Sequence, residues 1–174
     1  YTSLILGQYL GQCHLGNAYL RQIPFSDLKA FETIFSKLPK RLHLQLANSS
    51  TVRYAQLFEI PQQAEVFCNR GTSGIDGSTA TAVGAALINQ NPSLLVTGDL
   101  SFFYDINGLW NDYIPSNFRI ILINNQGGGI FRILPGEKDS PKYDTYFETV
   151  HGRNARQLSK TFGFQYKAVK SNIG

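Results

Sequence analysis

Four short runs with the pattern of strands, the first of them alternating apolar and polar residues, constrain the fold of this chain most strongly, because each leads into a loop of small and polar residues and then into a helical pattern. The runs lie at residues 42–46, 65–68, 94–97 and 119–123. The last is almost continuously apolar, as expected of a parallel strand buried on both faces. This alternation predicts an α/β fold, a doubly wound parallel sheet flanked by helices.

The segments between these runs carry helical patterns. Residues 26–38 place Phe31 and Phe35 on one apolar face, and Ser26 is available as the N-cap. Further helices are expected through Arg53 and Leu57 and over residues 78–89, 103–110 and 155–162. A final strand is expected over residues 164–169.

Composition excludes several classes of protein. The 174 residues are 43% hydrophobic, which suits one domain with a sizeable core. The 16 Lys and Arg and the 12 Asp and Glu are scattered, so a nucleic-acid partner is not expected, whereas an anionic small molecule is. Cys13 and Cys68 form neither a disulfide framework nor a zinc motif, which favours the cytoplasm. We expect no membrane span, and the absence of Met with Tyr1 at the start indicates a fragment.

The loop after the third run offers groups that suit a metal and an anion. Gly98 allows a tight exit from the strand, Asp99 presents a carboxylate oxygen, and Ser101 with nearby backbone N–H groups can face a phosphate. Taken alone, a Gly-Asp turn after a strand is common, and an ordinary turn with a helix cap explains it equally well.

The loop after the fourth run favours the metal interpretation. Asn125 follows Asp99 by 26 residues (125 − 99), which one helix and the next strand fill, so the two loops should lie side by side. They would meet at the carboxyl edge of the sheet, where open α/β sheets bind ligands. The Asn125 side chain and a free backbone carbonyl of Gly127 would add oxygen ligands to Asp99, as octahedral Mg²⁺ requires.

With these two loops the sequence resembles the thiamine-diphosphate enzymes. Gly-Asp-x-Ser followed at this spacing by Asn-Asn is the family's cofactor fingerprint, which GDLS…NNQGGGIF matches. The resemblance implies thiamine diphosphate beside Gly98, Leu100 and Ser101. It also implies Mg²⁺ or Mn²⁺ held by Asp99, Asn125 and the Gly127 carbonyl. Leu100 stands where the family more often has Gly, which should not disturb ligation.

Further runs narrow the resemblance to the menaquinone-biosynthesis branch of that family. NSSTVRYAQLF, NRGTSGIDGSTATAVGAA, GDLSFFYDINGLW and NNQGGGIFRILP look like that branch from Phe25 onward. The resemblance implies a transferase that joins decarboxylated 2-oxoglutarate to isochorismate and works as a homodimer or tetramer. The implied domain is the diphosphate-binding (PP) domain of the thiamine-diphosphate-binding fold at 26–174, truncated at the C-terminus, after a connecting helical segment at 1–25.

The resemblance also implies roles for single residues. Gly74 and Ile75 would contact the aminopyrimidine ring, with Ile75 wedged beneath the cofactor to enforce its bent shape. Arginines would grip substrate carboxylates, and apolar side chains would form a wall beside the thiazolium ring. The substrate-site residues are Ser49, Arg53, Arg70, Ile130, Phe131 and Leu134.

Several of these residues have simpler interpretations without the resemblance. Ile130, Phe131 and Leu134 at helical spacing are more typical of a core, and arginines such as Arg70 are more typical of a surface. His14, His43 and His151 fall in none of the shared motifs, so we assign them no chemistry.

No catalytic residue is expected within this chain. The resemblance places the activating glutamate on a pyrimidine-binding domain contributed by a partner subunit, and nothing in this sequence resembles that domain. The chain alone is therefore expected to be inactive.

Two rival functions stay open. Another thiamine-diphosphate 2-oxo acid decarboxylase or an acetolactate synthase-like enzyme would share the cofactor motifs, although Arg70 argues against a small uncharged donor. A non-catalytic nucleotide-binding domain would keep the fold without the chemistry, although Asp99 and Asn125 are intact.

Overall fold

A parallel sheet of four strands forms the centre of the described chain. The computed structural model describes residues 19–136 and 139–171. Its strands are β1 Leu42–Leu46, β2 Ala64–Cys68, β3 Ser93–Gly98 and β4 Phe118–Ile123, in the order β2-β1-β3-β4. The four strands predicted at residues 42–46, 65–68, 94–97 and 119–123 are confirmed to within one residue at either end. The chain winds from β1 outward to β2, and from β3 in the opposite direction to β4, so the topology reverses between β1 and β3.

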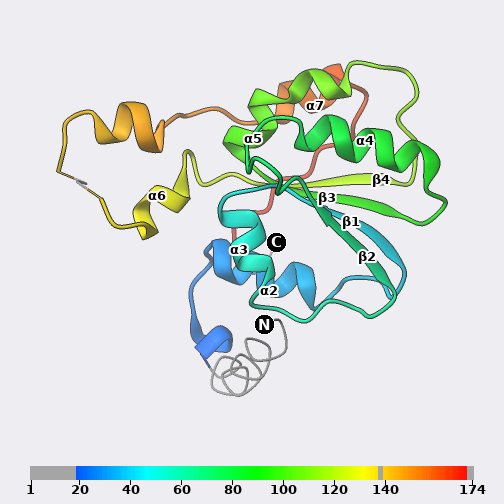
Figure 1. Cartoon of the computed structure of the whole chain (residues 1–174), viewed down its shortest axis with the longest axis horizontal. Coiled ribbons are helices and arrows are strands. Elements are labelled where there is room, and N and C mark those ends of the chain that lie inside the picture. The colour runs from blue at the N-terminus through cyan, green and yellow to red at the C-terminus, as the bar shows by residue number, and fades with distance from the viewer. Residues whose placement is uncertain (1–18, 137–138, 172–174) are drawn as a thin grey trace.

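Helices cover both faces of this sheet (Figure 1). One face carries α2 (Asp27–Phe35) and α3 (Ser50–Ala55), and the other carries α4 (Ser78–Ile88), α5 (Asp99–Tyr104) and α7 (Arg156–Thr161). Side chains of β3 alternate between two cores, because Leu94 and Val96 pack in the cluster that contains Phe31, whereas Leu95 packs in the cluster that contains Val83. The structure therefore confirms the predicted doubly wound α/β fold.

Helix α2 begins at the predicted N-cap. Ser26 is extended, with φ −160° and ψ 170°, and its hydroxyl accepts a hydrogen bond from the backbone N–H of Lys29 at 3.3 Å. Phe31 and Phe35 form the buried side of the helix, with ring centroids 6.0 Å apart. The expected connecting segment at 1–25 is described only from residue 19, and residues 19–22 are helical. Its remaining part, including His14 and Cys13, lies outside the described residues.

The helix after β3 begins earlier than predicted. Instead of one helix over residues 103–110, α5 begins directly at Asp99, and a separate 3₁₀ turn, η1, covers Ile106–Leu109. The Asp99 carboxylate accepts a hydrogen bond from the Leu100 N–H at 2.8 Å, which satisfies a donor of the first turn. Asp105 separates the two pieces because its carboxylate accepts from the backbone N–H of Ala80 in α4, at 2.8 Å.

The predicted strand over residues 164–169 is wrong. These residues belong to no strand of the described sheet, although the ring of Phe164 packs edge-on against Phe118 with centroids 6.4 Å apart. The alternating apolar residues have the pattern of a strand, but no neighbouring strand is hydrogen-bonded to them in the described sheet. The helix through Arg53 also ends earlier than expected, at Ala55, whereas the helices predicted over 78–89 and 155–162 are confirmed.

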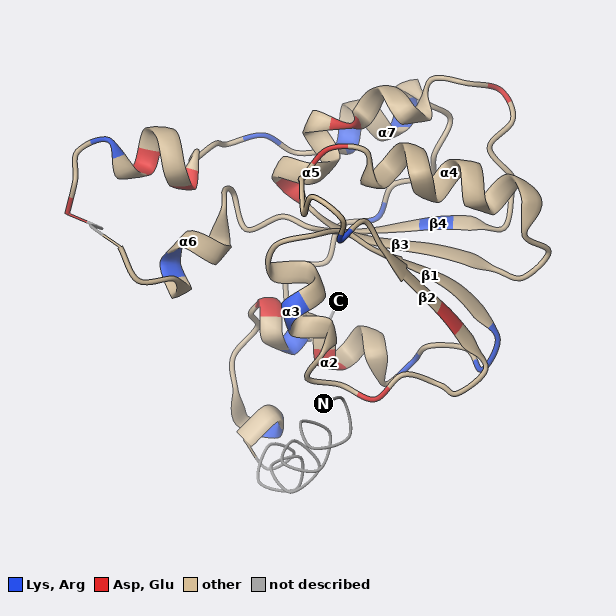
Figure 2. Cartoon of the chain, in the orientation of Figure 1, with Lys and Arg blue, Asp and Glu red and all other residues tan. Residues whose placement is uncertain are grey.

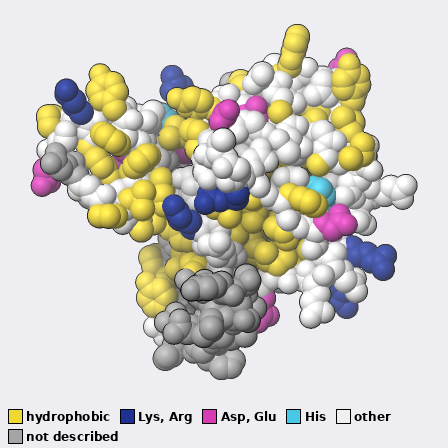
Figure 3. All heavy atoms as spheres, viewed as in Figure 1, with side chains coloured by type: hydrophobic (Ala, Val, Ile, Leu, Met, Phe, Trp, Pro, Cys, Tyr) yellow, Lys and Arg dark blue, Asp and Glu magenta, His cyan; other side chains and the backbone are white. Residues whose placement is uncertain are grey.

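Two short helices form an arm that projects from the sheet. They are α6 (Gly129–Ile133) and the π-helix η2 (Tyr143–Glu148), on the left of Figure 1. Hydrophobic side chains gather on this arm in Figure 3, and its exposed members include Ile133, Leu134, Tyr146 and Phe147. Across the described part of the chain, no helix combines the length and hydrophobicity that a membrane crossing needs.

Candidate functional site

Loops at the carboxyl edge of the sheet meet around a cavity of about 90 Å³. The loops after β1, β3 and β4 line it, together with the first residue of α2 and the loop that leads to α4. Cofactor sites typically measure about 300–1,000 Å³, so this chain by itself encloses only part of a site of that class. Many of the residues named from the sequence line the cavity: Ser49, Ile75, Gly98, Asp99, Leu100, Ser101, Asn125, Gly127, Ile130 and Phe131.

Four of the named residues lie outside this lining. Arg53 is exposed on α3, and Leu134 is 39% exposed at the end of α6. Gly74 and Arg70 connect to the cavity through Asn48, whose side chain they contact. Lys and Arg residues mark the ribbon at separate places rather than in one stripe (Figure 2).

The Asp99 side chain accepts three backbone hydrogen bonds at this cavity. It is 2% exposed, and its Oδ2 accepts hydrogen bonds from the backbone N–H groups of Gln126 at 2.7 Å and Gly127 at 3.1 Å. Among the described residues, its Oδ1 accepts a hydrogen bond only from the Leu100 N–H. Burial raises the pKa of Asp99 above its ordinary value, while the backbone N–H donors and His151 oppose that rise. One lone pair of Oδ1 therefore remains for a ligand.

His151 is a site residue that the sequence motifs did not reveal. Its Nε2 lies 3.3 Å from Asp99 Oδ2, and the ring is almost fully buried. Because Nδ1 accepts a hydrogen bond from the Arg153 N–H at 3.1 Å, the proton of a neutral ring would lie on Nε2, which is close to the carboxylate but forms no hydrogen bond with any described residue. The position of His151 depends on the chain returning to β4, where its N–H donates to the carbonyl of Gln126 at 3.1 Å. A short sequence motif cannot predict this contact between residues that are far apart along the chain.

Asn125 presents an unpartnered oxygen to this site. Its Nδ2 donates to Asp27 Oδ2 at 2.7 Å, while its Oδ1 is buried and has no hydrogen-bond partner among the described residues. Buried polar atoms are nearly always paired, so an orphaned oxygen here calls for a ligand. The Gly127 carbonyl accepts from the Gly129 N–H at 3.0 Å. We expected this carbonyl to be free, and it is not. Its oxygen still has a second lone pair that can bind a ligand.

Asn48 organises the loop between β2 and α4. It is 2% exposed, and its Nδ2 donates to the carbonyls of Asn69 and Gly74, each at 2.6 Å. Its Oδ1 accepts from Arg70 Nη1 at 3.2 Å. We assigned no role to Asn48 from the sequence, because the side chain's partners lie more than twenty residues away along the chain.

A second connection holds Ile75 beside the β3 loop. The Ser101 hydroxyl donates to the Ile75 carbonyl at 2.5 Å, so the hydroxyl expected to face a phosphate is used here to fix the neighbouring loop. Ser49, which also lines the cavity, has φ 69° and ψ −132°. This backbone conformation is costly for any residue except Gly, and such conformations concentrate at functional sites.

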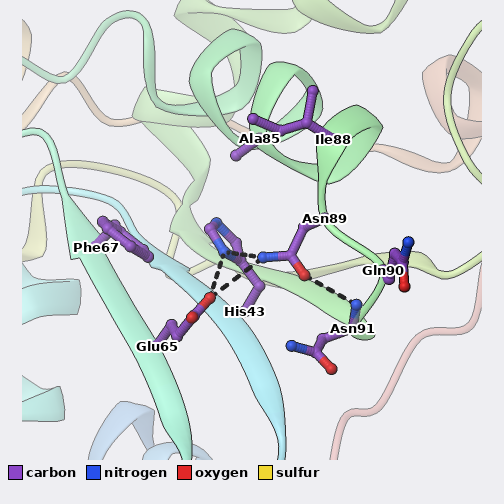
Figure 4. Close-up of a pocket in the computed structure, with 8 residues that line it drawn as sticks. All are labelled: His43, Glu65, Phe67, Ala85, Ile88, Asn89, Gln90 and Asn91. Carbon is purple, nitrogen blue, oxygen red and sulfur yellow. Dashed lines mark hydrogen bonds and ion pairs between the residues drawn. The ribbon is translucent and has the colours of Figure 1, made fainter.

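A larger cavity, of about 400 Å³, lies at the opposite, amino edge of the sheet (Figure 4). His43 is buried there, with its ring stacked on Phe67 at 4.9 Å and its Nδ1 2.8 Å from Asn89 Nδ2. Glu65 Oε2 lies 3.7 Å from His43 Nδ1. Ligands of doubly wound sheets bind at the carboxyl edge, and the side chains of His43, Glu65 and Asn89 are paired with one another, so this cavity is not the candidate site.

Comparison with known proteins finds several relatives that share one name. The chain is 62% identical over 154 residues to the 2-succinyl-5-enolpyruvyl-6-hydroxy-3-cyclohexene-1-carboxylate synthase of Flavobacterium psychrophilum, covering 88% of this chain and 28% of that protein. The synthases of Christiangramia forsetii and Bacteroides fragilis are 55% and 46% identical, over 91% and 86% of this chain and 27% of each protein. The chain is therefore similar to these synthases over most of its own length. It spans about 28% of their length.

Solved structures with low sequence identity share the fold. Benzoylformate decarboxylase from Polynucleobacter necessarius matches with a TM-score of 0.62 at 20% identity, over 82% of this chain and 28% of that one. A protein from Mycobacterium smegmatis, described as thiamin diphosphate-dependent, matches with a TM-score of 0.60 at 18% identity, over 86% and 28%. No protein-family model matches the chain.

Proposed function

We propose that this chain is the diphosphate-binding part of an enzyme that joins decarboxylated 2-oxoglutarate to isochorismate in menaquinone biosynthesis. The kinship to the synthases supports this reaction, and the fold neighbours support thiamine diphosphate as the cofactor. The observation that carries the proposal is local. Asp99 and the orphaned Oδ1 of Asn125 line one cavity at the end of neighbouring strands, where a metal-bound diphosphate requires them.

The residues of this cavity fit a hard divalent cation. One carboxylate oxygen of Asp99, the amide oxygen of Asn125 and the carbonyl of Gly127 each have a lone pair that no described residue uses. Mg²⁺ prefers this mixture of oxygens and shares its remaining positions with phosphate and water, and Mn²⁺ accepts the same set. The described residues contain no cluster of three or more His, Cys, Asp or Glu suited to a metal. The proposed set contains one carboxylate and does not depend on such a cluster.

The chain's own residues would orient the cofactor and exclude water. Thiamine diphosphate, when bound, supplies the electron sink for the carbanion that decarboxylation leaves. Ile75 and the apolar pair Ile130 and Phe131 line the cavity beside the metal ligands, and low polarity there would favour uncharged intermediates. Arg70, held by Asn48, and Arg53 on α3 are proposed to bind substrate carboxylates.

We further propose that the complete enzyme is a cytoplasmic homo-oligomer, at least a dimer. A pyrimidine domain of the partner subunit would contribute the activating glutamate, and residues 26–174 would be the diphosphate-binding domain after a connector at 1–25. The exposed apolar side chains on α6 and η2 support a partner surface there, since such patches are typical of interfaces. On this proposal the chain alone forms no product, and product formation by it would contradict the assignment of the glutamate to a partner.

Donor choice tests the proposed reaction. The complete protein, supplied with thiamine diphosphate, Mg²⁺ and isochorismate, is expected to release CO₂ from 2-oxoglutarate much faster than from pyruvate, because the distal carboxylate of 2-oxoglutarate needs a cationic partner. Rates from a coupled CO₂ assay provide the comparison. Preference for pyruvate would instead support the acetolactate synthase-like alternative, and failure to bind the cofactor would support a non-catalytic domain.

As the solution is acidified, metal binding is expected to weaken at a higher pH than at a site with an ordinary aspartate. A carboxyl group must lose its proton to bind a cation, and burial raises the pKa of Asp99 above the ordinary 3.8. As pH falls through that raised pKa, the proton competes with the metal, so the apparent affinity for Mg²⁺ decreases. Calorimetric titrations of the complete protein at descending pH, corrected with free thiamine diphosphate and the same metal, measure this. Constant affinity down to pH 3.8 would contradict the expectation.

A further inference from the structure

We propose that Asp27 is a positioning residue that turns the amide oxygen of Asn125 into the cavity. This inference rests on the proposed metal-diphosphate function and assigns a role to a residue outside the motifs. Asp27 is the first residue of α2, and its Oδ2 accepts a hydrogen bond from Asn125 Nδ2 at 2.7 Å, across 98 residues of sequence. Both side chains line the cavity that contains Asp99.

The chemistry of this contact sets the orientation of the amide. An ionised carboxylate only accepts hydrogen bonds, so it binds the NH₂ end of an Asn side chain and rejects the carbonyl end. With Nδ2 held by Asp27, Oδ1 must lie on the other side of the Asn125 amide, where it is buried and no residue that the structure describes is its hydrogen-bond partner. Without Asp27 the amide could rotate by half a turn and present its NH₂ group to the cavity, where it would repel a cation.

Neighbouring groups keep this contact in place. Phe31, one turn along α2, is 1% exposed and stacks on Tyr54 of α3 with centroids 5.2 Å apart, which anchors the helix that carries Asp27. Gly129 leaves room for the amide, because a Cβ at that position would lie 2.5 Å from Asn125 Nδ2. Two carboxylates, Asp27 and Asp99, line the same cavity, so a cation between them would also be favoured electrostatically.

A purely structural role makes a different prediction. An acidic residue in the first turn stabilises a helix through the helix dipole, and Asp27 occupies such a position in α2. If that were its only role, its loss would lower the stability of the helix without changing the affinity for a metal. Support of a metal ligand from outside its coordination sphere typically contributes about 10–100-fold in affinity.

The test measures metal affinity without turnover. The complete protein with saturating thiamine diphosphate is titrated with Mn²⁺, and the electron paramagnetic resonance signal of free Mn²⁺ gives the dissociation constant. Asp27→Ala is expected to weaken Mn²⁺ binding by about 10–100-fold. Glu32→Gln is the matched control, because it removes the same charge from the same helix at a residue paired with Lys29 at 3.1 Å, and it should bind as wild type.

A double-mutant cycle separates positioning from long-range charge. In an Asn125→Ala background, Asp27→Ala should cause a much smaller loss, limited to the electrostatic effect of its charge, because the amide that it orients is gone. Wild-type affinity in Asp27→Ala, or a full additional loss in the double variant, would overturn the proposal. If Asp27→Ala does not fold, Asp27→Asn keeps the side-chain volume but can bind either end of the amide, so it should also weaken binding, and unchanged affinity would overturn the proposal. Absence of metal-dependent cofactor binding in the wild-type protein would instead contradict the proposed function itself.

Discussion

Replacing Asp99 with alanine is expected to abolish metal-dependent binding of thiamine diphosphate. Asp99 would supply the one charged oxygen of the site, and it also accepts the N–H groups of Gln126 and Gly127 that shape the β4 loop. The loss of affinity should exceed the roughly 100-fold that groups outside the coordination sphere reach. Calorimetry of the complete protein with thiamine diphosphate and Mg²⁺ measures it.

Two further variants make this result specific. Asp99→Asn keeps an oxygen that can accept the backbone N–H groups but removes the charge, so it should fold and still lose the metal. Asp112→Ala, an exposed carboxylate outside the cavity lining, is the control and should bind as wild type. Metal-dependent binding that survives in both Asp99 variants would contradict the assignment of Asp99 as a ligand.

The largest expected effect on stability comes from Gly108→Ala. A Cβ on Gly108, in η1, would lie 2.8 Å from the backbone nitrogen and 2.9 Å from the Cα of Ala80 in α4. These are backbone atoms, so the helix and the turn must separate, at a cost of about 1–3 kcal/mol. Separation would also stretch the Asp105 hydrogen bond that caps α4. Faster hydrogen exchange of the α4 amides is the expected signal.

Gly84→Ala is the matched control for that substitution. Gly84 lies on the exposed side of the same helix, and a Cβ there meets nothing within 4 Å. Alanine should therefore stabilise α4 by about 0.5–1 kcal/mol, because glycine is the poorer helix former. The two substitutions should shift the exchange rates of the α4 amides in opposite directions, and slowing or no change in Gly108→Ala would contradict the close packing of η1 on α4.

Local signals predicted the sheet and the first helix well. Each strand is a short run with the pattern of a strand, bounded by turn residues, and Ser26 caps α2 as its position indicated. Signals that depend on distant partners failed. Residues 164–169 have the pattern of a strand but no neighbour in the described sheet, and α5 begins at Asp99 because the side chain of that residue satisfies the first turn.

The residues of the candidate site show the same difference between local signals and signals that depend on distant partners. The spacing of Asp99 and Asn125 predicted that their loops lie side by side, and the pairing of β3 with β4 confirms it. Asn48, His151 and Asp27 were not identified, because their contacts join segments more than twenty residues apart. The roles of the named residues toward cofactor and substrate stay predictions.

One calorimetric comparison tests the central claim most directly. The complete wild-type protein is titrated with thiamine diphosphate in the presence of Mg²⁺ and again after the metal has been removed with a chelator. A metal-diphosphate site formed by Asp99, Asn125 and Gly127 predicts tight binding with Mg²⁺ and weak or undetectable binding without it. Equal affinity under both conditions, or no binding under either, would contradict that site.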